Sequence, residues 1–339
     1  MSSTATNQQP TPVRIFQMLN AFQQTEALKA AIDLDVFTQL SGGPLTGPEL
    51  AKRIGAAPKG ARVLCDYLTL SGLLTKTEGK YSLTPDAQLF LSKRSPAYVG
   101  SATQFMCSDY HLRNFSHLAD AVRRGGSAAE DSSTSPDNPM WVNFARGMAP
   151  LRVPAAEFIA KLVGADEQKP IKVLDIAASH GIFGITIAKH NPKAEIVAVD
   201  WRNVLEVAKE NAAKAGVQNQ LKTIVGSAFE VDFGTGYDVA LVTAFLHHFD
   251  AATNEKFLKK VHAALKPGGV VATLEFVPND DRVTPPHAAG FALIMLSNTE
   301  SGDAYTFREL DQMYRRAGFG SSELHENPNS VDQVIITKK

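Results

Sequence analysis

Residues 173–184 read VLDIAASHGIFG, a strand-like run that enters a helical pattern through a short loop of small residues. This arrangement is typical of cofactor loops in doubly wound α/β proteins. Ala177 and Ser179 stand where the usual pattern, Asp175-x-Gly-x-Gly-x-Gly181, would have glycine. Both residues are small, so we expect a ligand to approach the backbone closely where φ is negative. The loop alone does not distinguish a dinucleotide from another adenosyl cofactor.

The chain around this loop alternates strand-like and helix-like segments. Apolar, β-branched runs without polar alternation indicate a parallel sheet that is covered on both faces. These runs are residues 171–176, 194–200, 221–226, 237–244 and 268–277. Residues 317–326 and 330–339 are expected to close the sheet as an antiparallel hairpin. The fold class is therefore α/β, with a Rossmann-like doubly wound sheet.

A different pattern precedes this region. Helical spacing at residues 13–40 is followed by a helix with a capping box (Thr46 and Glu49) that stops at Gly55, and then by a second helix. Two short strands around Glu78-Gly79 and a helix opened by Thr84-Pro85 complete a winged helix. We predict three regions: a winged-helix domain at 11–98, a helical connector at 99–165 and a cofactor domain at 166–339.

The winged helix allows two readings. A DNA reader needs a basic recognition helix, yet the second helix carries only Lys59 and Arg62 against Asp66. The alternative is a dimerisation module, because the helix at 13–31 carries more apolar surface than a small domain can bury alone. We favour the dimerisation module.

Composition narrows the function further. With 34 basic and 35 acidic residues, the net charge of −1 gives no reason to expect nucleic acid or an anionic membrane as partner. With only two cysteines, Cys65 and Cys107, we expect neither a disulfide framework nor a cysteine metal site, and we expect a reducing cytoplasm. The polar start and the absence of a long apolar run indicate neither a signal peptide nor a membrane span. Residues 125–139 are expected to form a surface loop.

Asp200 ends the strand that follows the loop. A carboxylate at this position can accept hydrogen bonds from both ribose hydroxyls of an adenosine-bearing ligand. The alternative is an N-cap for the helix that begins nearby, and both roles can hold together.

The segments AFLHHFD (244–250) and LKPGG (265–269), with the wing and FARGM (144–148), give the chain a family resemblance. It resembles class I S-adenosylmethionine-dependent methyltransferases, and in particular the plant-type small-molecule O-methyltransferases with an N-terminal dimerisation domain. The resemblance covers nearly the whole chain. It implies S-adenosylmethionine as cofactor, a homodimer, and a small-molecule acceptor, most simply a phenolic secondary metabolite.

The resemblance also implies catalytic residues. His247 matches the general base and Glu275 the carboxylate that orients it, which suits removal of a phenolic proton. The family has a second carboxylate at the position that corresponds to Ala304, so this chain has no carboxylate there. The alternative is that the paired histidines only end a strand and start a helix. The cluster of His247, His248, Asp250 and Glu275 is not expected to hold a metal, because adjacent histidines rarely face one ion.

The resemblance also implies which residues contact the cofactor. They lie in the loop, at the carboxylate that binds the ribose, and in the adenine pocket. Ser227 replaces an acid, Phe249 a stacking tryptophan and Thr243 a frequent lysine. The expected set is Asp175, Ala177, Ser179, Gly181, Asp200, Trp201, Ser227, Ala228, Phe229, Thr243 and Phe249.

The acceptor pocket is expected to be lined by methionines and aromatic rings, which suit a flat conjugated molecule. The candidates are Phe105, Met106, Tyr110, Phe144, Met148, Phe291, Met295 and Asn298. Other readings remain open at this point: methyl transfer to sulfur, nitrogen or carbon, a family member that has lost methyl transfer, and a winged-helix regulator.

Overall fold

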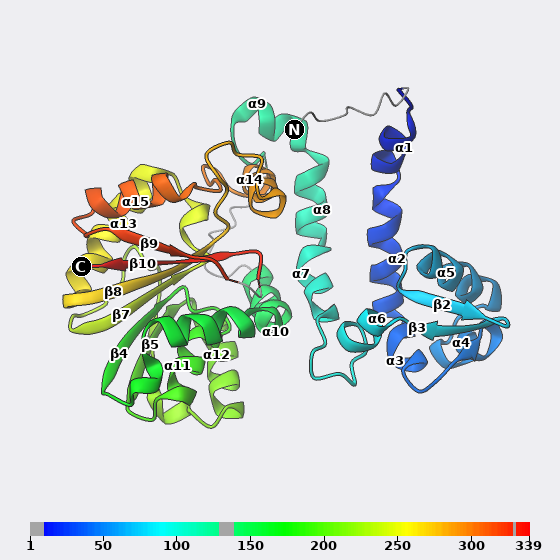
Figure 1. The fold of residues 1–339 in the computed structure, drawn as a ribbon, viewed down its shortest axis with the longest axis horizontal. Coiled ribbons are helices and arrows are strands. Elements are labelled where there is room, and N and C mark those ends of the chain that lie inside the picture. The colour runs from blue at the N-terminus through cyan, green and yellow to red at the C-terminus, as the bar shows by residue number, and fades with distance from the viewer. Residues whose placement is uncertain (1–9, 129–138, 328–329) are drawn as a thin grey trace, which may run out of the picture. The chain divides into compact units, whose positions relative to one another are not determined.

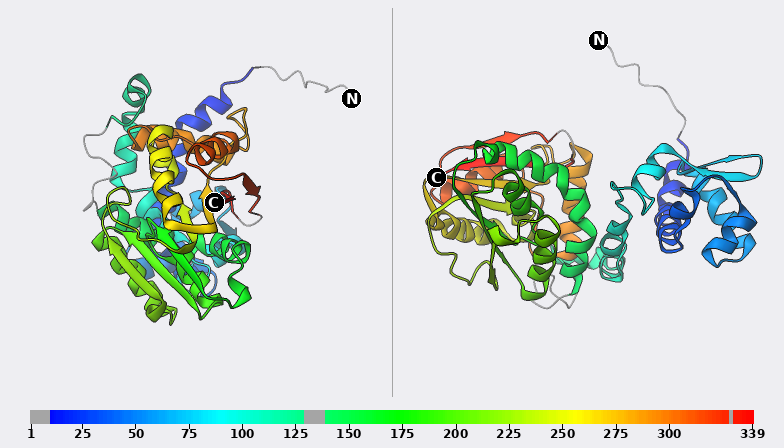
Figure 2. Two further views of the ribbon diagram at one scale, coloured as in Figure 1. Left: turned by 90° about the vertical axis from the view of Figure 1, so that its left-hand side faces the viewer. Right: turned by 90° about the horizontal axis from the view of Figure 1, so that it is seen from below.

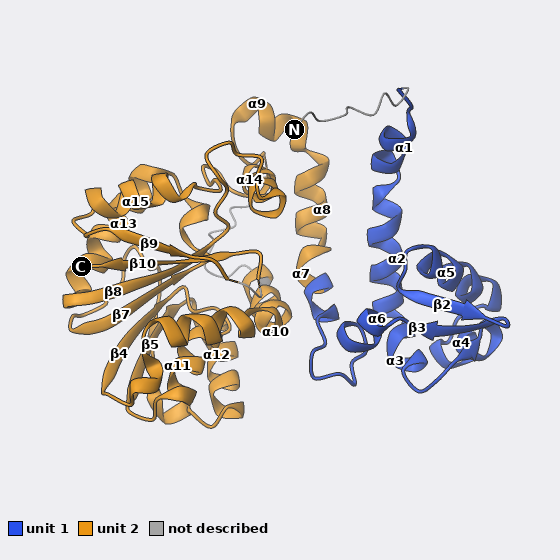
Figure 3. Cartoon of the chain, viewed as in Figure 1, with its two compact units in different colours: residues 1–103 blue, residues 104–339 orange. Residues whose placement is uncertain are grey.

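The computed structural model describes residues 10–128, 139–327 and 330–339 and divides the chain into two compact units, Met1–Thr103 and Gln104–Lys339 (Figure 3). Most of the surface loop expected at 125–139 lies outside the described residues. All candidate site residues belong to the second unit.

The first unit is a winged helix. Its elements are α1 (Val13–Leu19), α2 (Ala21–Asp33), α3 (Val36–Leu40), β1 (Leu45–Thr46), α4 (Gly47–Ile54), α5 (Pro58–Leu70), β2 (Leu74–Thr77), β3 (Lys80–Leu83), α6 (Pro85–Phe90) and the 3-10 turn η1 (Gly100–Ala102). The strands form an antiparallel sheet in the order β1-β3-β2. Thr46 and Glu49 make the expected capping box, and Gly55 ends α4 in the left-handed conformation. The core packs around Phe37, Leu50 and Tyr81.

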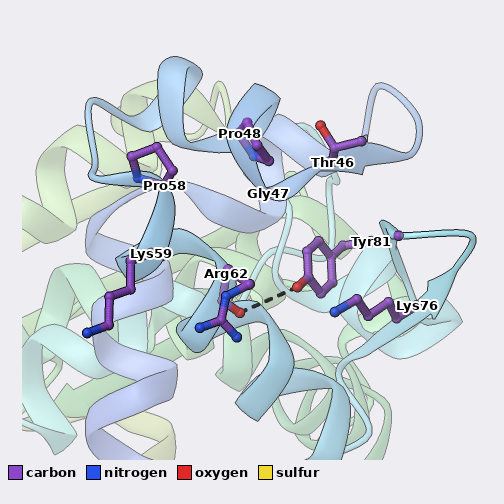
Figure 4. Close-up of a pocket in the computed structure, with 9 residues that line it drawn as sticks. Thr46, Gly47, Pro48, Pro58, Lys59, Arg62, Lys76 and Tyr81 are labelled. Atoms are coloured by element: carbon purple, nitrogen blue, oxygen red, sulfur yellow. Dashed lines mark hydrogen bonds between the residues drawn. The ribbon is translucent and has the colours of Figure 1, made fainter.

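A cavity of about 320 Å³ lies between the starts of α4 and α5 and the wing, lined by the cations Lys59, Arg62 and Lys76 (Figure 4). Two of these cations are paired with one carboxylate: Asp66 lies 3.0 Å from Arg62 and 2.6 Å from Lys76. The hydroxyl of Tyr81 also donates to Asp66. Lys76, Tyr81 and Arg62 together lower the pKa of Asp66 to about 2. The charges therefore hold the wing against α5.

The second unit is built on a seven-stranded sheet in the order β6-β5-β4-β7-β8-β10-β9 (Figure 1). The strands are β4 (Ile171–Ile176), β5 (Ala194–Asp200), β6 (Leu221–Val225), β7 (Tyr237–Thr243), β8 (Leu265–Glu275), β9 (Ser322–His325) and β10 (Gln333–Lys338). The first five strands are parallel, and β10 runs antiparallel to both β8 and β9. The doubly wound sheet and its closing hairpin are confirmed.

Helices cover both faces of this sheet (Figures 1 and 2). One apolar cluster joins the sheet to α10 (Pro139–Leu162), α11 (Ile182–His190) and α12 (Arg202–Lys214). The other cluster joins it to α13 (Ala251–Ala264) and α15 (Phe307–Arg316). Because β4 to β8 are buried from two sides, they read as continuous apolar runs.

The remaining helices of this unit come from the connector and from the segment after β8. They are α7 (Thr103–Met106), α8 (Asp109–Ser116), α9 (Leu118–Arg124) and α14 (Pro286–Asn298), with the 3-10 turns η2 (Ala165–Glu167), η3 (Gln218–Gln220) and η4 (Leu246–His248). α14 packs against α8 and α9. Across the described parts of the chain, no helix combines the length and apolarity that a membrane crossing needs.

Candidate active site

The candidate residues gather at one edge of the sheet. The cofactor loop follows β4, Asp200 ends β5, His247 follows β7 and Glu275 ends β8. Since these strands are parallel and adjacent, their carboxyl ends lie side by side. Open α/β sheets bind their ligands at this edge.

The cofactor loop turns through three left-handed residues. Ala177, Ser179 and Gly181 have φ of 51°, 52° and 70°. The condition of negative φ, under which we expected close backbone approach at the two replaced glycines, is not met: the chain keeps the glycine-type backbone and carries side chains on it. A left-handed alanine or serine is strained by roughly 1–2 kcal/mol. The loop shape is thus retained against local preference.

Two aspartates accept hydrogen bonds from backbone amides in and next to this loop. One Asp200 oxygen accepts the Ser179 amide at 2.8 Å and the other accepts the Trp201 amide at 2.7 Å. An oxygen of Asp175 accepts the Gly184 amide at 3.2 Å. Burial raises the pKa of Asp175 to about 7 and that of Asp200 to about 6. The N-cap reading of Asp200 is wrong, because Trp201 is the N-cap of α12.

Unpaired buried atoms in the loop fit a bound ligand. The hydroxyl of Ser179 and Oδ1 of Asp175 are buried and have no hydrogen-bond partner among the described residues. Buried polar groups are normally paired, so these atoms point to a partner that the protein itself does not supply. An adenosyl cofactor with hydroxyl and ammonium donors suits such acceptors.

The expected adenine pocket follows β6 and β7. Phe249 lies edge-on to Phe229 at 4.8 Å between ring centroids, and 5.1 Å from Phe245. Phe229, two residues after Ser227, is 38% exposed. The remaining expected residues of this group are buried or half-buried at the same edge: Trp201, Ala228 and Thr243.

His247 and Glu275 form a buried pair. Oε2 of Glu275 lies 2.5 Å from Nδ1 of His247, and both side chains are about 95% buried. The other oxygen, Oε1, accepts the amides of Phe245 and Leu246 at 3.1 and 2.9 Å. The carboxylate thus uses both oxygens to fix the turn and the imidazole. Nε2 of His247 makes no hydrogen bond to the described residues.

His248 lies on the other side of the same turn. Its ring is 4.3 Å from that of His247 and meets Trp141 edge-on at 5.5 Å. Burial, and then the charge of His247, lower the pKa of His248 well below its usual range. The two rings therefore have different partners. Both histidines lie in the 3-10 turn η4 between β7 and α13, and Asp250 caps α13 through the Thr253 amide.

One expected acceptor residue contacts His247 directly, and two others contact each other. Phe291 is edge-on to His247 at 4.8 Å, and Phe105 is edge-on to Phe144 at 4.9 Å. Oδ1 of Asn298 lies 2.8 Å from Nδ1 of His111, a residue that the sequence did not single out. Tyr110 and Met148 are half-buried and Met295 is buried, whereas Met106 is 59% exposed and stays outside this group.

The segment around the vacant carboxylate position also borders His247. The Asp303 amide donates to the carbonyl of His247 at 3.0 Å. The Asp303 carboxylate instead pairs with Arg282 at 3.3 Å, and Ala304 is fully buried. Glu275 is thus the carboxylate that reaches the imidazole.

Two further side chains near the loop were not predicted from the sequence. His180, inside the loop, stacks on Phe144 at 6.4 Å with 16° between the rings. Arg152, two turns along α10 from Phe144, forms a buried ion pair with Asp332. The spacing of Phe144, Met148 and Arg152 on one helix face was a usable signal for Arg152. In the described residues no three His, Cys, Asp or Glu side chains are grouped as metal ligands.

Comparison with known proteins decides the family. Residues 16–93 match the model of the O-methyltransferase dimerisation domain, and residues 115–320 match that of the O-methyltransferase domain. The chain belongs to the O-methyltransferase family. The methyltransferase assignment and its cofactor, S-adenosylmethionine, are confirmed.

Individual O-methyltransferases are similar over almost the full length. The 3-hydroxy-5-methyl-1-naphthoate 3-O-methyltransferase of Streptomyces sahachiroi is 28% identical, with 91% of this chain and 89% of the relative covered. A crystal structure from Nostoc punctiforme, named as a candidate O-methyltransferase, is 48% identical with a TM-score of 0.94, covering 98% and 100%. Human N-acetylserotonin methyltransferase in complex with S-adenosylmethionine shares the fold, at 23% identity and a TM-score of 0.84, covering 100% and 99%.

Proposed function

We propose that this O-methyltransferase methylates a phenolic hydroxyl of a small aromatic metabolite, with His247 as general base. The observation that carries the proposal is the buried His247–Glu275 pair at the carboxyl ends of β7 and β8. The similarity to a naphthoate 3-O-methyltransferase supports an aromatic acceptor.

The geometry suits removal of a proton. Glu275 accepts from Nδ1 of His247, which fixes the tautomer and leaves Nε2 with its lone pair for a hydroxyl. Once Nε2 takes the proton, the carboxylate 2.5 Å away stabilises the imidazolium. When bound, S-adenosylmethionine supplies an electrophilic methyl group on sulfur.

The aromatic rings of the expected acceptor pocket can position the acceptor. Phe291, Phe144 and Phe105 present ring edges and faces that a flat acceptor can stack on. Holding the hydroxyl beside Nε2 and excluding water is itself worth several kcal/mol of the barrier. An aromatic acceptor therefore fits both the walls and the base.

The test is the replacement of His247 by asparagine. Turnover of a phenol should fall roughly 10²–10⁴-fold, the usual contribution of a positioned base. Affinity for S-adenosylmethionine, measured by calorimetry, should stay nearly intact, because the imidazole is bonded to Glu275 and not to the cofactor loop. The loss should shrink as the pH approaches the pKa of the phenol, since solvent then supplies the phenolate.

His248→Asn is the matched control, because this ring lies in the same turn without a bond to Glu275. It should reduce turnover much less. Equal, pH-independent losses in both variants would remove His247 from the catalytic residues.

The acceptor atom is tested with a panel of phenols, thiols and amines, followed by mass spectrometry. Glu275→Gln should matter little for a soft thiolate, which needs no oriented base, and should slow phenols strongly. Methylation of thiols alone would contradict the phenolic assignment.

A further inference from the structure

A polar cluster joins α8 to α14, two helices that pack against each other (Figure 1). Its members are His111 and Asn114 of α8 and Asn298 of α14. Oδ1 of Asn298 lies 2.8 Å from Nδ1 of His111 and 2.9 Å from Nδ2 of Asn114. The two asparagines are buried and His111 is half-buried. The proposed removal of a proton by His247 does not use this cluster.

The cluster borders the expected acceptor pocket. Phe291, the ring in contact with His247, and Asn298 are seven residues apart in α14, which places both on one helix face. On the α8 side, the ring of His111 is edge-on to Phe105 at 4.5 Å. The cluster therefore adjoins rings that are expected to hold the acceptor.

Hydrogen bonds also join the end of α14 to the turn that carries the base. The Gly302 amide donates to the hydroxyl of Thr299, the residue after Asn298, at 3.0 Å. The next amide, that of Asp303, donates to the carbonyl of His247 at 3.0 Å. Asn298 is thus held close to the catalytic turn.

One backbone carbonyl determines which atoms of the cluster donate and which accept. Nδ2 of Asn298 donates to the carbonyl of Ile294 at 2.9 Å, and a carbonyl can only accept. Oδ1 of Asn298 therefore faces α8, and both Asn114 and His111 must donate to it. Because Nδ1 of His111 carries the proton, Nε2 is left with a lone pair. The amide oxygen of Asn114 is left as an acceptor in the same way.

The two acceptors that remain have no donor in the described parts of the chain. Nε2 of His111 makes no hydrogen bond there, and Oδ1 of Asn114 is buried and has no partner. Burial lowers the pKa of His111, which keeps its imidazole neutral and its lone pair available. Buried polar groups are normally paired, so these atoms indicate a donor that comes from a ligand.

We propose that the acceptor carries, besides the hydroxyl that is methylated, a second hydroxyl or an N–H group that donates to His111 and Asn114. His111 is then a residue that determines specificity. An ether or a carboxylate at this place brings only lone pairs and leaves both acceptors unpaired. The inference rests on the proposed aromatic acceptor and adds a second functional group to it.

The experiment compares 2,7-dihydroxynaphthalene with its monomethyl ether, 7-methoxy-2-naphthol. Calorimetry on the complex with S-adenosylhomocysteine gives both affinities, and mass spectrometry with S-adenosylmethionine gives kcat/KM. The wild type should prefer the diol roughly 5–50-fold, the effect of leaving buried acceptors unpaired in the ether complex. The two equivalent hydroxyls of the diol account by themselves for only about a twofold preference.

Two substitutions of His111 separate recognition from a structural role. His111→Leu removes the acceptor, so most of the preference should disappear while the affinity for the ether stays nearly unchanged. His111→Gln has an amide that can donate to Asn298 and accept from the ligand, so it should keep most of the preference. His117→Leu makes the same change at an exposed histidine after α8 and should leave the preference unchanged.

Equal affinities of the wild type for the two naphthols, or binding of neither, would overturn the proposal. Equal weakening of both ligands in the leucine and glutamine variants would give His111 a structural role only and would also overturn it. Preferential binding of the diol without methylation of either naphthol would instead contradict the proposed function and support this inference.

Discussion

Backbone strain in the cofactor loop is concentrated at two residues. Ala177 and Ser179 keep the left-handed conformation that glycine adopts freely. We expect Ala177→Gly and Ser179→Gly each to raise the free energy of unfolding by about 1 kcal/mol, the strain relief being partly offset by the greater freedom of glycine in the unfolded chain. Urea unfolding of the cofactor-free protein measures this.

Ala178 lies between these two residues and is the matched control. It is buried and is not left-handed. Ala178→Gly should therefore destabilise the protein by roughly 1 kcal/mol, through lost packing and added chain entropy. Destabilisation by all three substitutions would show that the loop is not strained.

Asp175 should make the stability of the cofactor-free protein fall with pH. Its folded pKa is raised by burial to about 7, from an ordinary value of 3.8. A carboxyl with a raised folded pKa contributes stability that is fully present below about pH 4 and is lost as the pH rises through about 7. Asp175→Asn does not titrate, so it escapes this loss.

The free energy of unfolding of Asp175→Asn, relative to that of the wild type, should therefore increase between pH 5 and pH 8. At 1.4 kcal/mol for each pH unit, the growth is on the order of 3 kcal/mol. Guanidinium unfolding at the two pH values gives the difference, and the subtraction cancels any fixed effect of the amide. A gain that is constant or shrinks with pH would contradict the assignment.

Some residues of the site could be predicted from local sequence patterns, whereas contacts between distant residues could not. Asp200 and the loop were found because they lie within one strand–loop–helix–strand unit, whose local pattern is informative. The pairing of Arg152 with Asp332 joins residues 180 positions apart, so no local pattern records it. His247 and Glu275 were found through family resemblance alone, because 28 residues separate them as well.

At the scale of elements, helix α11 packs unusually close to β5. A Cβ on Gly184 would lie 2.5 Å from Ile196 and 2.9 Å from Asp175. Gly184→Ala should therefore lower the free energy of unfolding by roughly 1–3 kcal/mol, although alanine is the better helix former. Thermal unfolding measures the change.

Gly290 provides the opposite case in α14. Its position is exposed, and a Cβ there meets nothing within 4 Å. Gly290→Ala should raise the stability by about 0.5–1 kcal/mol, which is the difference in helix propensity. If both substitutions acted in the same direction, packing against β5 would not be what requires glycine at 184.

Elements were more predictable than contacts. The strands β4, β5 and β7 and the capping box at Thr46 follow the sequence because apolar runs and cap residues act locally. The left-handed φ of Ala177 was missed because residue type alone favours negative φ there. The sheet below the loop and the amide bonds to Asp200 override that preference.

At the scale of the whole molecule, α1 of the first unit has an apolar surface that the single chain leaves uncovered. None of its residues is buried, and the exposed side chains, each more than half accessible, are Val13, Ile15, Phe16, Met18 and Leu19, continued by Phe22 of α2. A soluble chain rarely leaves such a stripe in water. Together with the matched dimerisation domain, it supports the proposal of a homodimer.

Phe16→Asp combined with Leu19→Asp should dissociate the dimer, because each association would bury the new carboxylates within the apolar interface. Sedimentation velocity at micromolar concentration should give a dimer for the wild type and a monomer for the variant. Leu70→Asp is the control: this side chain at the end of α5 is 85% exposed but outside the α1 stripe, so the dimer should persist. A wild-type monomer would contradict the homodimer, and dissociation by the control alone would place the contact between subunits away from α1.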